Sequence, residues 1–254
     1  MSAASVQTQP FIEQTIDRFL NYPVDCRLIS PESKFKFIEG LDSEAGFDFY
    51  NISFSPFHGT NLLIKNLLDK ILAIFFLILT MPITILAIIM ILLLDGFPIF
   101  YKQKRTGWDG ATFVIFKFRT LSSSSNVSES TQVVRGDRRV TKLGSILRRF
   151  SIDELPQFVN VLKGNMSIVG PRPHPIGQIK HFSKEIINFM QRHKCPPGLT
   201  GWAQVNGLRG TSKQEFMMNK RYQYDLYYIK NWSIIFDIYI MVRTVFVVIL
   251  SKVD

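Results

Sequence analysis

The hydropathy pattern of the chain is dominated by one apolar segment of 24 residues, Ile71 to Leu94, which contains no charged side chain. At about 1.5 Å per residue, a helix of that length reaches across roughly 30 Å of hydrocarbon. Pro82 divides the segment into halves of 11 and 12 residues, and a proline removes a backbone donor and clashes with the preceding turn. The pattern therefore predicts a membrane helix that is broken near its centre.

The charges around this segment bear on its topology. Basic residues stand near both ends: Lys65 and Lys70 before it, and Lys102, Lys104 and Arg105 after it. Because lysine and arginine favour the cytosolic face, a helix that enters, bends at Pro82 and returns to the same face is predicted. Thr80, or serine and threonine neighbours, are expected to cover backbone groups that the proline frees. A kinked single span is the alternative, and the length of the run disfavours a buried core helix of a soluble protein.

A second hydrophobic region, Trp232 to Leu250, is interrupted by Asp237 and Arg243. A charge near the centre of a bilayer costs at least about 2.5 kcal/mol, so this region is expected to lie along the interface as an amphipathic helix. The segment before it, Arg221 to Trp232, mixes tyrosines with basic residues, a composition typical of headgroup depth. An ordinary amphipathic core helix is the alternative.

Between these regions, two apolar runs flank a turn at Gly107 to Gly110 and predict a pair of strands. Period-two alternation puts Phe113, Ile115, Lys117 and Arg119 on one face of the second strand. Lys117 and Arg119 would then be neighbours that can grip phosphate oxygens. A solvated strand end explains the same pattern equally well.

A short amphipathic helix is predicted over residues 141–150. Four apolar residues recur there at helical spacing and are expected to be buried: Leu143, Ile146, Leu147 and Phe150. Arg148 and Arg149 stand at its end.

The next stretch, SIDELPQFVNVLKGNMSIVGPRP from Ser151 to Pro173, places two adjacent carboxylates shortly before an arginine between prolines. Ser151 and Glu154 have the spacing of a capping box, which is the structural interpretation of Glu154. Asp153 would then be a first-turn acid that favours the helix dipole. Adjacent helical residues lie about 100° apart, so Asp153 and Glu154 cannot share a proton symmetrically, and we expect distinct roles for them.

The helix that starts there is expected to bury its apolar side and to expose a polar one. The buried set is Leu155, Phe158, Val159 and Leu162, and the polar row facing away from the core is Asp153, Gln157 and Asn160. Beyond it, two prolines fix the backbone on either side of Arg172, and a stiff arginine suits a diphosphate. An exposed arginine in a proline-rich turn is the alternative. The glycine-rich segment Pro197 to Gly210 permits close backbone approach to a ligand, which is weak evidence alone.

Composition narrows the possible partners. The 254 residues include 30 Lys or Arg against 20 Asp or Glu, and the net charge of +10 suits an anionic membrane, a nucleic acid or a phosphorylated substrate. The basic stretch Arg135 to Lys142 lacks interleaved aromatic residues, so nucleic-acid binding is not expected. Cys26 and Cys195 are far apart, with no CxxC or neighbouring histidine pair, so neither a zinc site nor a disulfide framework is indicated.

Five motifs, taken in order, make the chain resemble the bacterial sugar transferase family, the monotopic phosphoglycosyl transferases that start glycan assembly on a polyprenyl phosphate. These motifs are LLDKILAIFFLILTMPITI, FKFRT, SIDELPQFVNVLKGNMSIVGPRP, PGLTGWAQVNG and YDLYYIKNWSIIFDI, within roughly Asn61 to Val248. The family often has serine before the helix-breaking proline, where this chain has Met81.

The resemblance implies a mainly α fold with a small β-hairpin, in a monotopic membrane protein with a proline-broken re-entrant helix and interfacial amphipathic helices. We expect a variable N-terminal extension over residues 1–60 and a re-entrant hairpin over 61–98. A cytosol-facing catalytic domain with C-terminal interfacial helices is expected over 99–254. The implied location is the cytosolic face of the bacterial inner membrane.

The implied activity is transfer of a hexose-1-phosphate from a nucleotide sugar, expected to be a UDP-sugar, to undecaprenyl phosphate with release of UMP. This is the first membrane step of exopolysaccharide, O-antigen or other glycan synthesis. Asp153 would attack the sugar-bearing phosphate and form a covalent phosphosugar intermediate. Asp153 and Glu154 would hold Mg²⁺, or Glu154 would assist proton removal.

The residues expected to bind phosphates are basic: Lys117, Arg119, Arg148, Arg172 and Arg209. The implied partners are the nucleotide sugar, undecaprenyl phosphate and the membrane, with a homodimer left open. The rival interpretation is a noncatalytic basic module docked on the membrane, in which Ser151 and Glu154 only cap a helix.

Overall fold

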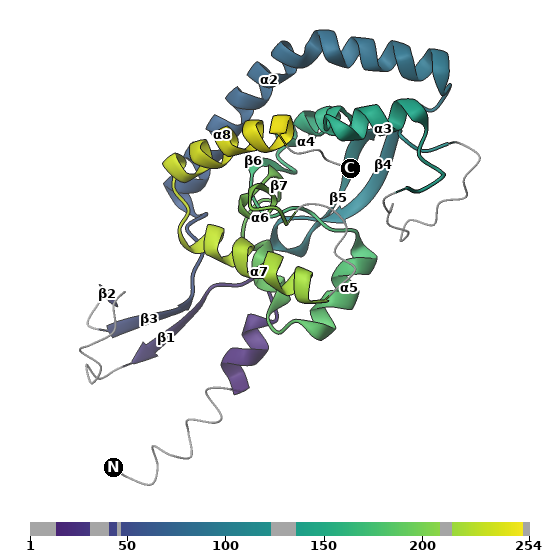
Figure 1. The fold of residues 1–254 in the computed structure, drawn as a ribbon. Helices are drawn as coiled ribbons and strands as arrows, with labels where there is room; N and C mark the ends of the chain where they lie inside the picture. The colour runs from purple at the N-terminus through teal and green to yellow at the C-terminus, as the bar shows by residue number, and fades with distance from the viewer. Residues whose placement is uncertain (1–13, 31–40, 45–46, 123–135, 209–214, 251–254) are drawn as a thin grey trace.

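The computed structural model describes residues 14–30, 41–44, 47–122, 136–208 and 215–250. This part of the chain is mostly helical with three small sheets, so the prediction of a mainly α fold with a β-hairpin is confirmed (Figure 1). The α-helices are α2 (Gly59–Leu94), α3 (Lys142–Arg149), α4 (Phe158–Leu162), α5 (Ile176–Glu185), α6 (Trp202–Val205), α7 (Glu215–Lys230) and α8 (Ile234–Leu250), and residues 14–20 are also helical. The 3-10 helices are η1 (Trp108–Gly110), η2 (Ile152–Gln157) and η3 (Phe189–Lys194).

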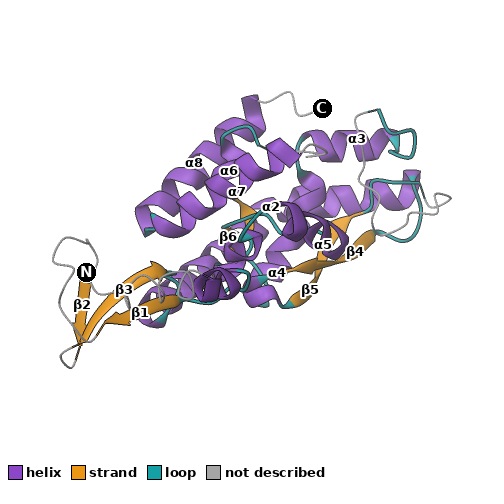
Figure 2. Cartoon of the chain, turned by 90° about the horizontal axis from the view of Figure 1, so that it is seen from below, coloured by secondary structure: helices purple, strands orange, loops and turns teal. Residues whose placement is uncertain are grey.

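The strands form three separate sheets. They are β1 (Cys26–Ser30), β2 (Leu41–Glu44), β3 (Phe47–Ser53), β4 (Phe100–Thr106), β5 (Thr112–Phe118), β6 (Ser167–Val169) and β7 (Gly198–Thr200). The order is β1-β3-β2 in an antiparallel N-terminal sheet, with an antiparallel pair β4-β5 and a parallel pair β6-β7. The N-terminal sheet projects from the helical body, as two views agree (Figures 1 and 2).

Helix α2 contains the predicted membrane segment. It is one helix of 36 residues with Pro82 inside it, and it changes direction near its middle (Figure 1). Pro82 has no N–H for the carbonyl of Ile78 four residues earlier, and the hydroxyl of Thr80 donates instead to the carbonyl of Phe76 at 2.7 Å. Thr80 therefore does not cover the Ile78 carbonyl, because its short side chain bonds one turn back along its own helix.

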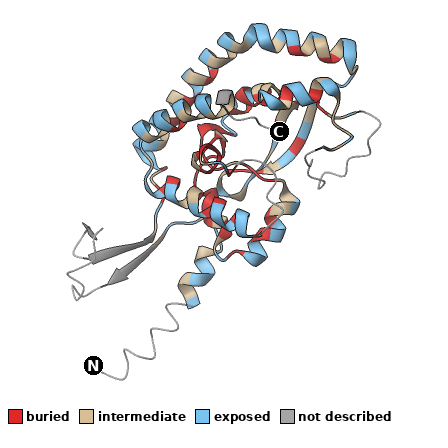
Figure 3. Cartoon of the chain, viewed as in Figure 1, coloured by how far each residue is buried: buried red, intermediate tan, exposed pale blue. Residues whose placement is uncertain are grey.

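Most of α2 lies outside the protein core. Among the described residues it is the one helix long and apolar enough to cross a membrane, and only 11% of its most apolar stretch is buried. Figure 3 shows its exposed length. A core helix of a soluble protein would be covered by other elements, so that alternative is wrong for α2.

Side chains near the start of α2 bond to α8 through buried charges. Lys65 Nζ lies 2.7 Å from Asp237 Oδ2 and 3.7 Å from Asp69 Oδ2. Asp237 also accepts hydrogen bonds from the Tyr228 hydroxyl at 2.7 Å and from the Trp232 indole at 3.0 Å. Asp237, one of the two charges that interrupt the second hydrophobic region, is thus neutralised within the protein.

The predicted hairpin is present. In the β4-β5 pair, Tyr101 lies opposite Lys117, Gln103 opposite Ile115, and Arg105 opposite Phe113. Opposed residues of an antiparallel pair point to the same face, so Arg105 and Lys117 share one face of the hairpin.

Helix α3 forms as predicted, but only part of its apolar set is buried. Leu147 joins Ala87 and Ile91 of α2 in a small core, whereas Ile146 and Phe150 are 54% and 55% exposed. The prediction of four buried residues is wrong for these two, because α3 contacts the protein along a narrow stripe. Gly144 in that stripe lies so close to Thr120 that an added Cβ would stand 2.3 Å from its carbonyl oxygen.

Candidate active site

The carboxylate pair lies on η2, a 3-10 turn that continues into α4. Ser151 has φ of +57° and ψ of 20°, a left-handed conformation, and its side chain caps nothing. Its carbonyl accepts the Glu154 amide at 3.1 Å. The predicted capping box is therefore wrong, since an N-cap residue needs extended backbone angles. Glu154 is left without the structural role that the sequence offered for it.

The polar row on η2 and α4 is buried, contrary to prediction, and Val159, predicted to be buried, is 38% exposed. Asn160 is fully buried because its side chain replaces backbone partners of β5. Its Oδ1 accepts the Phe116 amide at 3.0 Å, and its Nδ2 donates to the Val114 carbonyl at 2.7 Å. These bonds fix α4 against β5, so Glu154 is held beside Lys117 of that strand.

Both oxygens of Glu154 are occupied by cations. Its Oε1 lies 2.7 Å from Lys117 Nζ and 2.6 Å from Arg172 Nη2, and its Oε2 lies 3.3 Å from Arg172 Nη1. Glu154 raises the pKa of Arg172 above its usual value. Burial lowers the pKa of Lys117, and the attraction of Glu154 opposes that shift. The three side chains form a compact, mostly buried ion cluster.

Asp153 differs from its neighbour. It is equally buried, at 9% exposure, but no hydrogen bond or ion pair joins its carboxylate to another residue in the described part of the chain. Burial raises its pKa, with a further rise from Glu154, while Lys117, Arg148 and Arg172 lower it. Asp153 is thus a desolvated carboxylate whose oxygens form no hydrogen bond or ion pair with another described residue, and several positive charges lie near it. These properties favour nucleophilic attack on an anionic phosphorus centre.

The structure does not bring all predicted phosphate-binding residues together. Lys117 and Arg172 contact Glu154 directly, and Arg148, at the end of α3, acts on Asp153 through its charge. Arg119 instead donates to the carbonyls of Asp95 and Gly96, at 2.5 and 2.6 Å, where α2 ends. Arg209 lies outside the described residues.

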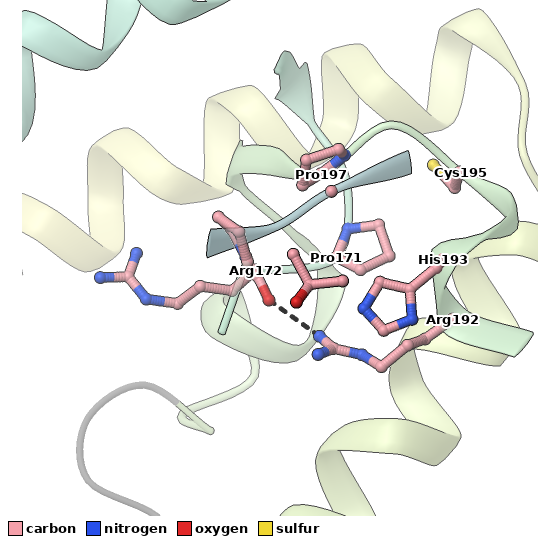
Figure 4. A pocket seen from close by; sticks show the side chains of 9 residues that line it. Pro171, Arg172, Arg192, His193, Cys195 and Pro197 are labelled. Atoms are coloured by element: carbon pink, nitrogen blue, oxygen red, sulfur yellow. Dashed lines mark hydrogen bonds between the residues drawn. The ribbon is translucent and has the colours of Figure 1, made fainter. Parts of the chain in front are cut away.

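The loop that carries Arg172 is held by its own backbone. Three successive carbonyls are bonded: Pro171 to the Gly198 amide, Arg172 to Arg192 Nη2, and Pro173 to Arg105 Nη1, each at 2.9 Å. Figure 4 shows the bond from Arg192 to the carbonyl of Arg172. The presentation of a stiff arginine thus depends on these three bonds as well as on its prolines.

The glycines around this loop allow backbone to pack on backbone. A Cβ on Gly170 would stand 2.3 Å from the Pro196 carbonyl oxygen, one on Gly198 2.1 Å from the Gly170 amide, and one on Gly201 2.2 Å from the Gly170 carbonyl oxygen. Close approach to a ligand was the predicted reason for Gly198 and Gly201. In the structure, the backbone that these two glycines approach closely is that of residues 170–173, the segment GPRP.

Sequence reasoning missed Arg105 as part of the site and treated it only as a flanking charge. Besides holding Pro173, its side chain donates to Gln103 Oε1 at 2.7 Å. Burial, followed by repulsion from Arg172, lowers its pKa to about 10, while Glu154 acts in the opposite direction. The signal was available, because alternation along β4 puts Arg105 on the same face as Lys117.

Comparison with known proteins shows which sequences the chain is similar to. The family described as Bacterial sugar transferase matches residues 60–251. A UDP-glucose:undecaprenyl-phosphate glucose-1-phosphate transferase of Escherichia coli is 44% identical over 192 residues, covering 76% of this chain and 41% of that protein. A protein of the same name from Xanthomonas campestris pv. campestris is 39% identical over 237 residues, covering 92% of this chain and 49% of that protein.

A shorter relative is matched over nearly its whole length. The exopolysaccharide production protein PSS of Rhizobium leguminosarum bv. phaseoli is 37% identical over 189 residues, covering 73% of this chain and 94% of that protein. By contrast, the chain spans less than half the length of the first two relatives.

Proposed function

Because the chain belongs to the bacterial sugar transferase family, we propose that it transfers a hexose-1-phosphate from a UDP-sugar to undecaprenyl phosphate and releases UMP. The observation that carries the proposal is the contrast within the carboxylate pair. Glu154 is saturated by Lys117 and Arg172, while the neighbouring Asp153 is buried and uncommitted. A helix-capping role for Glu154, on which the noncatalytic rival rested, has lost its support.

The proposed reaction has two displacements at phosphorus. A carboxylate oxygen of Asp153 attacks the sugar-bearing phosphorus, a new O–P bond forms, and the bond to the second phosphate breaks, so UMP leaves. An oxygen of undecaprenyl phosphate then attacks the same phosphorus and breaks its bond to Asp153. The products are undecaprenyl diphosphosugar and the original carboxylate, so one difficult displacement becomes two easier ones.

The surrounding cations reduce the repulsion between an anionic nucleophile and a diphosphate. Lys117 and Arg172 can exchange Glu154 for phosphate oxygens, since guanidinium groups bind phosphate and carboxylate with similar geometry. Arg105 and Arg148 add positive charge from β4 and from the end of α3. Fixed charges of this kind stabilise charge that develops in a transition state.

Mg²⁺ is part of the proposal. No group of three or more His, Cys, Asp or Glu side chains able to hold a metal occurs among the described residues, so the proposed ligands are the two adjacent carboxylates Asp153 and Glu154. Once Lys117 and Arg172 exchange Glu154 for phosphate oxygens, that donor set would fit Mg²⁺, which is commonly held by one or two carboxylates together with substrate phosphates. When bound, the ion would neutralise charge on the diphosphate.

Exposed apolar side chains indicate which surface meets the membrane. They lie on α2, α3 and α8 and include Ile78, Leu79, Ile146, Phe150, Ile235, Val245 and Phe246. Patches of this kind mark interaction or membrane surfaces. We place them in the cytosolic leaflet of the bacterial inner membrane, with α2 as a re-entrant helix and α8 at the interface.

Single-cysteine labelling tests this topology. In a variant with Cys26 and Cys195 replaced by serine, Thr60→Cys and Lys104→Cys mark the two flanks of α2. Both are expected to react with an impermeant maleimide in inverted vesicles and to be protected in intact spheroplasts. Labelling from opposite sides would refute the re-entrant helix and indicate a full span.

A screen of nucleotide sugars tests the activity. Purified protein with undecaprenyl phosphate is expected to release UMP from one or more UDP-hexoses, with UDP-glucose the first candidate because relatives are named for it. EDTA should stop the release, and added Mg²⁺ should restore it. Absence of release with every donor would reject the proposal in favour of the noncatalytic module, and full activity in EDTA would reject the metal alone.

A further inference from the structure

Helix η3 ends in four consecutive polar residues that are all buried. Gln191, Arg192, His193 and Lys194 are between 2% and 5% exposed. Such residues are mostly found at protein surfaces unless they are paired. Their burial requires that other parts of the chain supply partners for them.

Arg192 joins η3 to α7 and to the backbone of Arg172. Its guanidinium donates to Asp225 Oδ2 at 2.7 and 3.0 Å, and these side chains are only 2% and 3% exposed. The same Nη2 donates to the carbonyl of Arg172 at 2.9 Å (Figure 4). The position of η3 is therefore transmitted directly to the backbone of Arg172.

Gln191 and Lys194 are paired with the N-terminal segment. Gln191 Nε2 donates to the Leu20 carbonyl at 2.6 Å, and its Oε1 accepts the Ser53 hydroxyl at 2.7 Å. Lys194 Nζ donates to Ser53 Oγ at 2.6 Å and lies 3.1 Å from Asp25 Oδ1. The Ser53 hydroxyl thus joins both side chains to the strand that ends there.

We propose that Leu20, Asp25 and Ser53 position Arg172 through η3, so that affinity for the diphosphate donor depends on residues that lie before the family match at residue 60. This inference rests on the proposed function. Gln191 and Lys194 stand on either side of Arg192 within one short helix, so loss of their N-terminal partners displaces Arg192. Arg172 then loses the bond that fixes its carbonyl, and its guanidinium group no longer meets the donor phosphates in a single geometry.

Ser53→Ala tests the link with a minimal change of shape. It removes one hydroxyl and leaves two buried side chains short of a partner. We expect the KM for the UDP-sugar to rise about tenfold, which is about 1.4 kcal/mol of donor binding. The KM for undecaprenyl phosphate and kcat should stay within about twofold. A purely structural defect would instead lower the active fraction, and so would lower kcat and leave the donor KM unchanged.

Two further variants complete the comparison. Asp25→Asn removes the other N-terminal partner of Lys194 and is expected to raise the same KM. Asn21→Ala is the matched control, since in the same segment Asn21 is exposed and its amide bonds only the Asp17 carbonyl. Unchanged donor KM in both Ser53→Ala and Asp25→Asn, or an equal change in Asn21→Ala, would overturn the inference.

Calorimetric titration separates this inference from the proposed activity. UDP-glucose binding is measured in the Asp153→Asn background, where no turnover is expected, with and without Ser53→Ala. A weaker Kd in the double variant supports the positioning role even if the wild type releases no UMP. Equal Kd values, or no binding in either variant, would reject it.

Discussion

Asp153→Asn is expected to abolish sugar-phosphate transfer, by at least about 10⁴-fold in kcat, because removal of a covalent nucleophile leaves only binding and electrostatic effects. Asparagine keeps the shape of the side chain but cannot form the acyl phosphate. Because Asp153 makes no hydrogen bond or ion pair with another described residue, the variant should fold and still associate with membranes. Release of UMP from the UDP-sugar is the measurement.

The covalent intermediate gives a second measurement for the same substitution. With UDP-glucose and no acceptor, intact-protein mass spectrometry should show one added hexose phosphate on the wild type and none on Asp153→Asn. Asp109→Asn is the matched control, because Asp109 lies in the left-handed turn between β4 and β5, where asparagine is tolerated. Normal turnover by Asp153→Asn, or the same added mass on it, would remove Asp153 as the nucleophile.

The raised pKa of Asp153 also makes the substitution informative about stability. A carboxyl group whose folded pKa lies above its unfolded value of about 3.9 binds its proton more tightly when folded. Its ionisation therefore opposes folding as pH rises through the folded pKa, and burial is the principal cause here. Asp153→Asn should melt at a higher temperature than the wild type at pH 7.5, and the difference should disappear under acid conditions below both pKa values.

Lys117 tests the same electrostatics through the pH profile. The ammonium group lowers the pKa of Asp153, opposing the effect of burial. Lys117→Met removes that influence, so the acid limb of kcat/KM is expected to move to higher pH. An unchanged limb would mean that it reports another group.

The elements that could be predicted from the sequence are those whose pattern is local. The apolar run of α2 and the alternation of β4 and β5 are periodic over many residues, and the structure contains these elements. Ser151 was misread because its spacing to Glu154 satisfies a capping box, while its backbone angles depend on how η2 meets α3. A motif specifies residue types, but the local backbone decides whether they act as a cap.

The errors at the site come from contacts between distant parts of the chain. Asn160 is buried because β5, more than 40 residues earlier, offers it one backbone donor and one acceptor. No prediction for Arg192 follows from the sequence, because its partners, Asp225 and the Arg172 carbonyl, are 33 and 20 positions away in the chain. No helical or strand period encodes such pairings, so a buried polar side chain resembles an exposed one in a single sequence.

Glu154→Gln is expected to reduce kcat by about 10² to 10³-fold, comparable with removal of one group that stabilises a transition state. The glutamine oxygen still accepts one hydrogen bond, but Lys117 and Arg172 lose the charge between them. Removing one partner of a buried ion pair costs about 3 to 5 kcal/mol of stability. We expect the lower end, about 3 kcal/mol, because 16% of Lys117 and 24% of Arg172 remain exposed. Activity and chemical denaturation are measured together, with Glu185→Gln as the control, since Glu185 pairs only with His181 at the surface.

The reason for the loss of turnover lies in what Glu154 does for its neighbour. While it holds Lys117 and Arg172, those cations do not form an ion pair with Asp153, whose oxygens stay free for attack. In Glu154→Gln the two cations turn to Asp153 or to the donor phosphates, so the KM for the UDP-sugar should fall while kcat also falls. Loss of Glu154 removes one cause of the raised Asp153 pKa, so the acid limb should move to lower pH. A variant with kcat within tenfold of the wild type would show that Asp153 needs no such protection.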